Sequence, residues 1–201
     1  MKIFNTLSRR VEEFKPIKKG FVGLYTCGPT VYDFSHIGNF RTYIFEDLLR
    51  RTLEWNGFKV KQVMNITDVE DKIIKKAIEE SKTISEITLP YTRIFFSDLK
   101  DLNIEKAAVY PQATKHIKDM LRMVQALVEK GFAYRGKDDS VYFEIDKFPE
   151  YGKLAGLDKV TLKSGARVES DEYDKEEARD FVLWKAMKPK EPSWPSVFGP
   201  G

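Results

Sequence analysis

A strand, a helix and a second strand follow one another between residues 21 and 66, and this order restricts the fold more than any other feature. Residues 21–26 form a short apolar, β-prone run that stops at the turn-forming CGPT of residues 27–30. Residues 40–55 have helical spacing, and residues 58–66 are typical of a second strand. Strands joined by one helix run parallel with a right-handed crossover. The sequence therefore predicts a βαβ unit of an α/β nucleotide-binding sheet, with its ligand at the carboxyl ends of the strands.

The helix expected over residues 40–55 has one apolar face and one charged face. The apolar set, which we expect to face the core, consists of Phe40, Tyr43, Ile44, Leu48 and Leu49. The charged set, which we expect to face solvent, consists of Arg41, Asp47, Arg50, Arg51 and Glu54. Gly57 follows as a stop signal.

Helices and one hairpin are expected in the middle of the chain. Apolar stripes at helical spacing lie in residues 73–78, 87–99 and 117–128, and we interpret all three as core faces. Residues 132–145 hold two β-prone runs around a polar turn, which indicates a hairpin. The stretch that follows is mixed and rich in glycine and charge, and the final KPKEPSWPSVFGPG has no periodicity.

Composition sets limits on location and class. The 201 residues are 42% hydrophobic and 32% charged, as in a globular chain. The 34 basic and 31 acidic residues leave a net charge of +3, which neither requires nor excludes a nucleic-acid partner. We expect no membrane span and no signal peptide, because long apolar runs are absent. A single cysteine suits the reducing cytosol, so we expect a cytoplasmic protein.

Candidate ligand-binding residues lie where the loop after the first strand enters the first helix. Amide groups at a helix start, with the positive end of its dipole, bind anions. The imidazole of His36 and the carboxamide of Asn39, three residues apart, project to the same side there, and Gly38 allows a flat ligand to approach the backbone. Taken alone, the pattern His-x-Gly-Asn is better explained by a capping or core histidine.

The longer segment CGPTVYDFSHIGNFRT, residues 27–42, resembles the HIGH signature of class I aminoacyl-tRNA synthetases, in the form of the cysteinyl-tRNA synthetases. Asn39 stands where the general class I pattern has a second histidine, so it offers a neutral hydrogen-bond donor. Further matches follow in the family's order: KIFNT at residues 2–6, NITD at residues 65–68 and DFVLWK at residues 180–185.

The resemblance implies a Rossmann-type parallel sheet, the first half of a class I catalytic domain, over residues 1–112. It implies a mixed α+β connective insertion over residues 113–201, ending before the second half of the active site. The complete enzyme would activate cysteine with ATP and Mg²⁺ and transfer it to the tRNA for cysteine, as a monomer. We expect the chain as given to be an incomplete, inactive fragment of it.

The resemblance also implies the ATP site. His36 and Asn39 would be the catalytic pair, holding the ATP phosphates and stabilising charge that develops at the α-phosphorus. Thr30 and Gly38 would complete the ATP-binding set.

A second implied site selects cysteine. Cys27 matches the first of the family's four ligands to one Zn²⁺ ion per full-length chain. Zinc deprotonates a bound thiol and takes serine far less well, so coordination can select cysteine. Gly28 and Thr67 would line the amino-acid pocket beside Cys27.

Other polar residues have weaker interpretations. Asp68 and Asp71 would pair with a substrate amine or cap a helix starting near Lys72, and we favour capping. His116 is expected to be an exposed side chain on the first helix of the insertion. The sequence KAMKPK of residues 185–190 resembles the family's KMSKS loop superficially, and we interpret it as surface.

Three alternatives stay open. A related ligase that joins cysteine to an amino sugar shares the zinc and HIGH features. A class I synthetase for another amino acid is disfavoured by Cys27-Gly28-Pro29. The third alternative is a binding module or fragment without catalysis.

Overall fold

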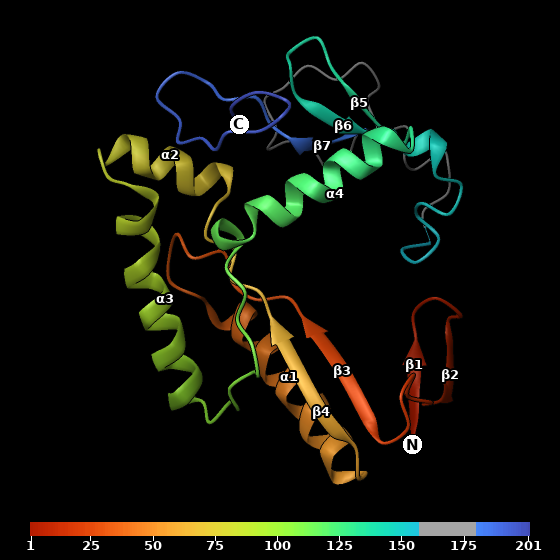
Figure 1. Cartoon of the computed structure of the whole chain (residues 1–201). Helices are drawn as coiled ribbons and strands as arrows, with labels where there is room; N and C mark the ends of the chain where they lie inside the picture. The colour runs from red at the N-terminus through yellow and green to blue at the C-terminus, as the bar shows by residue number, and fades with distance from the viewer. Residues whose placement is uncertain (157–179) are drawn as a thin grey trace. The chain divides into compact units, whose positions relative to one another are not determined.

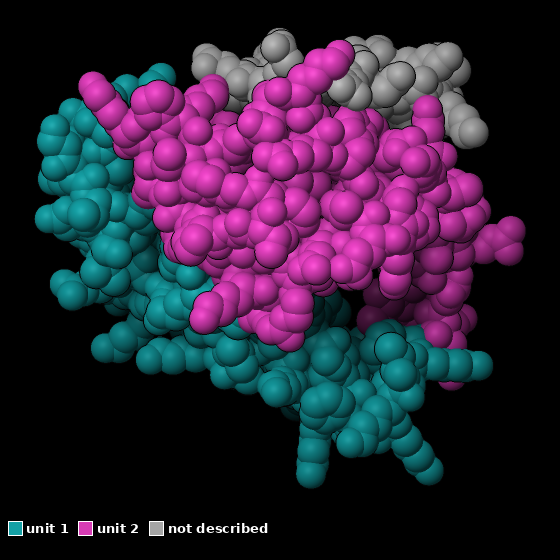
Figure 2. Space-filling model, turned by 45° about the horizontal axis from the view of Figure 1, so that its top comes forward, with its two compact units in different colours: residues 1, 14–116 teal, residues 2–13, 117–201 magenta. Residues whose placement is uncertain are grey.

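The computed structural model describes residues 1–156 and 180–201. Part of the glycine- and charge-rich stretch after the predicted hairpin, residues 157–179, therefore lies outside the described residues. The chain forms two compact units, coloured separately in Figure 2. Unit 1 contains Met1 and residues 14–116, and unit 2 contains residues 2–13 and 117–201.

Unit 1 is built on the predicted βαβ element (Figure 1). Strand β3 (Phe21–Thr26) pairs in parallel with β4 (Lys59–Met64), and helix α1 (Ile37–Trp55) connects them. Residues 108–112 run along the other edge of β4, where the Met64 amide donates to the Val109 carbonyl at 3.1 Å and the Ile66 amide to the Pro111 carbonyl at 2.8 Å. The prediction of a parallel sheet with a crossover helix is confirmed.

The loops after β3 and β4 stay paired beyond the strands themselves. The Thr67 amide donates to the Pro29 carbonyl at 3.0 Å, and the Val31 amide donates to the Thr67 carbonyl at 3.1 Å. This pairing holds the two chain segments together at the carboxyl end of the sheet, where the sequence predicts the ligand.

The predicted faces of α1 are partly wrong. Tyr43 is buried as expected, but Ile44 and Leu48 are 47% and 58% exposed. Asp47, which we assigned to the solvent face, is buried. Its carboxylate accepts from the Glu105 amide at 3.0 Å and pairs with Arg51 at 2.7 Å. An apolar stripe gives the period of a helix, whereas the buried side depends on which neighbours arrive from elsewhere in the chain.

Two further helices complete unit 1. Helix α2 (Asp71–Glu79) packs on α3 (Ile84–Asp101), and α3 begins at a capping box in which Thr83 and Glu86 satisfy each other's backbone amides. One core cluster lies between the two helices, formed by Ile73, Ala77 and Ile87. A larger one joins the sheet to α1 and α3, formed by Val31, Tyr43, Met64, Ile66, Phe95, Leu99 and Ile104.

The capping interpretation of Asp68 is wrong. Glu70 is the N-cap of α2, accepting from the Lys72 amide at 3.2 Å, and Asp71 lies in the first turn. Asp68 is buried and accepts instead from the amide and hydroxyl of Thr114, at 2.9 and 2.6 Å. It therefore fastens the end of β4 to a short 3-10 turn, Ala113–Lys115.

Unit 2 contains α4 (Ile117–Glu129) and an antiparallel sheet of β5 (Ala133–Arg135), β6 (Val141–Phe143) and β7 (Phe181–Trp184). The β5–β6 pair confirms the predicted hairpin. Strand β7 and the hairpin of β1 (Lys2–Asn5) with β2 (Arg10–Glu13) were not predicted. A second short 3-10 turn, Ile145–Lys147, follows β6. The core of the unit includes Ile117, Val124, Ala133, Val141 and Trp184.

Two surface predictions have clear outcomes. His116 is exposed, but it ends the 3-10 turn before α4 and does not lie on the helix, which corrects its predicted place. Residues 187–190 of the KAMKPK segment are exposed, as expected for surface. Within the two described ranges, no helix is long and apolar enough to cross a membrane.

Candidate functional site

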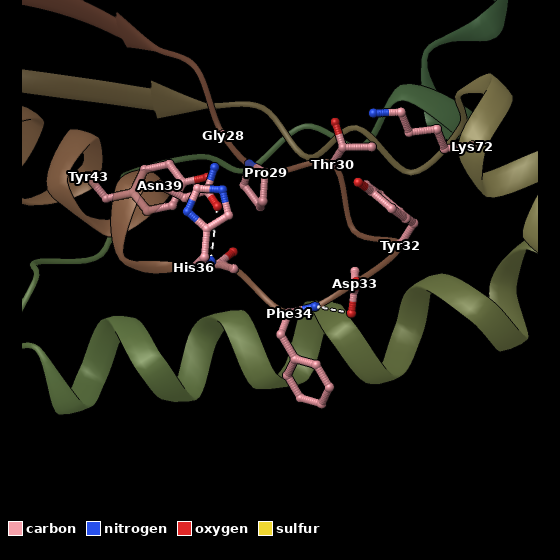
Figure 3. Close-up of a pocket in the computed structure, with 11 residues that line it drawn as sticks. Gly28, Pro29, Thr30, Tyr32, Asp33, Phe34, His36, Asn39, Tyr43 and Lys72 are labelled. Atoms are coloured by element: carbon pink, nitrogen blue, oxygen red, sulfur yellow. Dashed lines mark hydrogen bonds between the residues drawn. The ribbon is translucent and has the colours of Figure 1, made fainter.

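A cavity of about 350 Å³ opens at the carboxyl end of β3, within unit 1 (Figure 3). The loop after β3, the first two turns of α1 and the first turn of α2 supply its walls. The lining residues are Gly28, Pro29, Thr30, Tyr32, Asp33, Phe34, Ser35, His36, Asn39, Tyr43 and Lys72. Four predicted site residues line the cavity, namely Gly28, Thr30, His36 and Asn39, whereas Cys27, Gly38 and Thr67 are outside its lining.

His36 and Asn39 form a reciprocal cap at the start of α1. The Gly38 amide donates to Nδ1 of His36 at 3.0 Å, and the His36 amide donates to Oδ1 of Asn39 at 3.0 Å. Because Nδ1 accepts, the proton of the neutral imidazole lies on Nε2. Because Oδ1 of Asn39 accepts, its amide nitrogen keeps two hydrogens for a ligand. The capping and ligand-binding interpretations of His36 are therefore compatible.

This cap produces an anion-binding arrangement. Figure 3 places the imidazole and the carboxamide side by side at the first turn of α1, among the residues that line the cavity. The helix dipole adds positive potential at the same point. The donors of His36, Asn39 and the helix start suit a phosphate group.

Two glycines fit their positions for steric reasons. A Cβ at Gly38 would lie 2.8 Å from the His36 ring, so glycine leaves room for the capping imidazole. A Cβ at Gly28 would lie 1.8 Å from the Asn65 carbonyl oxygen, which is backbone and cannot rotate away. Gly28 thus allows the loop after β3 to pass directly against the end of β4.

The side chain of Asn65 links the loop after β3 to the segment that follows β4. The sequence analysis assigned Asn65 no role. Its Oδ1 accepts from the Gly28 amide at 3.0 Å and from the Tyr25 hydroxyl at 3.1 Å. Its amide donates to Oγ1 of Thr67 at 3.1 Å. Asn65 therefore orients both Gly28 and Thr67. Its place in NITD, residues 65–68, one of the segments that match the family, was the available signal.

Cys27 follows β3 as an exposed free thiol. Its described polar contact is weak, a 3.8 Å approach of Sγ to the Gly28 carbonyl. An accessible thiol at a strand end fits the donor chemistry of zinc. In the described part of the chain, no group of three histidine, cysteine or acidic side chains gathers around one point. The described residues therefore supply one candidate zinc ligand here, where zinc takes about four.

A buried polar cluster of Thr26, Glu46 and Gln62 lies near Tyr43, one of the lining residues. The Gln62 amide donates to the Thr26 hydroxyl at 3.2 Å, and Thr26 hydrogen-bonds Glu46. Burial raises the pKa of Glu46 above its ordinary value, although the Thr26 bond opposes the shift. Burial, with Glu46 and Cys27 nearby, raises the pKa of Tyr43 to about 12. The Tyr43 hydroxyl therefore stays neutral at physiological pH.

Comparison with known proteins gives the family. Residues 13–201 match the family described as tRNA synthetases class I (C), catalytic domain. A cysteine–tRNA ligase of Protochlamydia amoebophila is 51% identical over 206 residues, covering 100% of this chain and 43% of that protein. Those of Koribacter versatilis and Pyrococcus horikoshii are 50% and 48% identical, with 100% of this chain and 41% and 42% of those proteins covered.

A solved structure agrees with the fold. The LeuRS of Agrobacterium radiobacter K84, in a ternary complex with tRNA and LeuAMS, has a TM-score of 0.51 and 20% identity, covering 66% of this chain and 17% of that one. The chain spans about two fifths of the length of the curated relatives that it matches. It belongs to the class I (C) tRNA synthetase family, within the catalytic domain.

Proposed function

We propose that this chain forms part of a cysteine–tRNA ligase, which joins cysteine to its tRNA at the expense of ATP. Identity of about 50% to cysteine–tRNA ligases along the whole chain is the observation that supports it most. The pocket at the end of β3 agrees with it, because its donors suit the phosphates of a nucleotide.

In the first step, a carboxylate oxygen of cysteine attacks the α-phosphorus of ATP, which is bound with Mg²⁺, and pyrophosphate leaves. His36 and Asn39 would donate from Nε2 and from the amide nitrogen to phosphate oxygens, stabilising the charge that develops there. Thr30 would add a hydroxyl from the loop after β3. The Gly38 amide would hold the His36 ring through its bond to Nδ1. The work of these residues is positioning and electrostatics, without a covalent enzyme intermediate.

In the second step, a hydroxyl of the tRNA for cysteine takes the cysteinyl group from the adenylate, and AMP leaves. We propose a monomeric, cytoplasmic enzyme.

Selection of cysteine would depend on the end of β3. Zinc would bind the substrate thiol as thiolate, and this coordination would discriminate cysteine from serine. Cys27 would be one ligand, and the others would come from parts of a longer protein. Gly28 and Thr67 would line the amino-acid site, and Asn65 would hold both in place through the hydrogen bonds described above.

One experiment tests this proposal against its nearest alternative. The complete protein is supplied with ATP and cysteine, and with either tRNA or an amino sugar as acceptor. We expect Cys-tRNA and no cysteinyl amino sugar. Cys27→Ser should lose both charging and bound zinc, measured by atomic absorption, because a hydroxyl is a weak zinc ligand. Stoichiometric zinc in this variant would remove Cys27 from the site, and a product with the amino sugar alone would favour the alternative ligase.

A further inference from the structure

We infer that Lys72, a residue given no role so far, binds the phosphate groups of the nucleotide in this pocket. The inference rests on the proposed function for the identity of the nucleotide as ATP. Three observations support a phosphate site at Lys72: its position in the cavity, its contacts, and the charges of the other lining residues.

Lys72 reaches the cavity from the first turn of α2, the helix that follows β4. It belongs to the lining, and its amine lies 5.6 Å from the centroid of the Tyr32 ring, another lining residue. In Figure 3 the side chain leaves α2 and extends in the direction of Thr30. The ring face of Tyr32 therefore supports an amine that remains open to a ligand.

A second lysine one turn along α2 has a different environment. The Lys76 amine donates to the Tyr32 carbonyl and to the Tyr91 hydroxyl, both at 2.8 Å, and the bond to Tyr91 raises its pKa. Lys76 thus fastens the loop after β3 to α2 and α3. Among the described residues, no carboxylate forms an ion pair with the Lys72 amine, and its cation–π contact leaves its hydrogens available.

The charge balance of the cavity makes Lys72 important. Among the described residues that line the cavity, it is the single lysine or arginine, and Asp33 adds a carboxylate to the same lining. The Asn39 carboxamide is neutral and a neutral His36 brings one N–H donor, so neither offsets the charge of a triphosphate. Lysine is a common point-charge partner of phosphate.

The position of Lys72 favours phosphate over the carboxylate of the amino acid. Lys72 shares its cavity with His36, Asn39 and Thr30, the residues proposed for ATP. Of the residues proposed for the amino acid, Gly28 borders the same cavity, whereas Cys27 and Thr67 are outside its lining. We therefore assign the Lys72 amine to a nucleotide phosphate.

The test measures binding of ATP, inorganic tripolyphosphate and adenosine to the complete protein by calorimetry. Lys72→Met should weaken ATP and tripolyphosphate roughly tenfold or more, the usual effect of losing a charge-assisted bond, and leave adenosine unchanged. Lys75→Met is the matched control, because Lys75 is an exposed lysine of the same helix outside the lining, and it should change nothing.

Lys72→Arg keeps the charge and should retain most of the tripolyphosphate affinity. This variant is a control that distinguishes loss of the charge from a general effect of substitution on folding. Unchanged ATP affinity in Lys72→Met would overturn the inference. An equal loss for adenosine, or no tripolyphosphate binding by the unsubstituted protein, would overturn it as well. If ATP binding depends on Lys72 but tRNA is not charged with cysteine, the proposed function fails while the phosphate site stands.

Discussion

The two ring nitrogens of His36 have different roles. Nδ1 caps the start of α1, and Nε2 is left to bind a ligand. The sequence motif identified the residue and its position at the helix start. It did not reveal the reciprocal bond between the His36 amide and Asn39, which fixes the direction of both side chains. Hydrogen-bond partners of this kind depend on backbone geometry, which a residue pattern does not contain.

Substitution of His36 can separate its two roles. In the complete enzyme, His36→Ala should slow adenylate formation roughly 10²-fold, the typical effect of removing one preorganised donor to transition-state charge. It should also cost about 1 kcal/mol of stability, because the cap is lost. His36→Ser restores a good N-cap without the Nε2 donor, so stability should return and activity should not. Normal pyrophosphate exchange in the serine variant would show that His36 acts only as the N-cap of α1.

Glu46 gives a prediction about pH. Burial raises its pKa above the ordinary 4.5, so the folded state binds its proton more tightly than the unfolded state does. Stability is then lost as pH rises from below 4.5 through the folded-state pKa, and the loss persists at pH 7 to 8. Among the described residues, one Glu46 oxygen is buried without a hydrogen-bond partner, which agrees with an unfavourable charge there.

Glu46→Gln removes this charge while keeping the shape of the side chain. Urea unfolding of this chain should therefore find the variant more stable at pH 7.5, with the gain vanishing at pH 4 and below. Glu79→Gln, at an exposed position of α2, is the matched control. A glutamine variant that is less stable at pH 7.5, or a gain independent of pH, would contradict the assignment.

At the scale of elements, periodicity located most of the described helices and strands but not always their buried face. Strands β3 and β4 with α1 were predictable because each is long enough to display its period. Strands β5 and β6, with three residues each, were found through the polar turn between two β-prone runs. Strands β1, β2 and β7, with four residues each, were not recognised. The burial of Asp47 depends on the Glu105 amide, which arrives from a distant part of the chain.

The crossing of the β3 loop over the end of β4 can be tested with two glycines of the same segment. Gly28→Ala would place a Cβ 1.8 Å from the Asn65 carbonyl oxygen, so the loop must separate from β4. We expect a loss of about 1–3 kcal/mol in urea unfolding, as for other overpacked sites. Gly23→Ala, inside β3, meets nothing within 4 Å and should be nearly neutral. Equal stabilities of the two variants would contradict the tight crossing.

At the scale of the whole molecule, the exposed surface of unit 1 predicts how the chain as given behaves. Strand β3 pairs with β4 on one edge, and within the described residues it has no strand partner on the other. Phe45, Leu48 and Trp55 of α1 are 63%, 58% and 92% exposed. Open strand edges and apolar patches promote association. We expect self-association of this chain that rises with concentration in sedimentation, and we expect it not to charge tRNA.

Leu48→Lys should weaken that association, because it places a charge in the middle of the apolar surface of α1. A chain that stays monomeric at every concentration would contradict this account, and so would a lysine variant that associates as strongly as the unsubstituted chain. Charging of tRNA by the purified chain, free of full-length enzyme, would show that the essential residues lie within it.

We propose that the pocket at the end of β3 belongs to an enzyme that activates cysteine with ATP. The most direct test is pyrophosphate exchange by the complete protein, measured with each of the standard amino acids in turn. We expect exchange with cysteine and none with serine, because the thiol is the group that is selected. Exchange that is supported by another amino acid, or that is absent with cysteine, would contradict it.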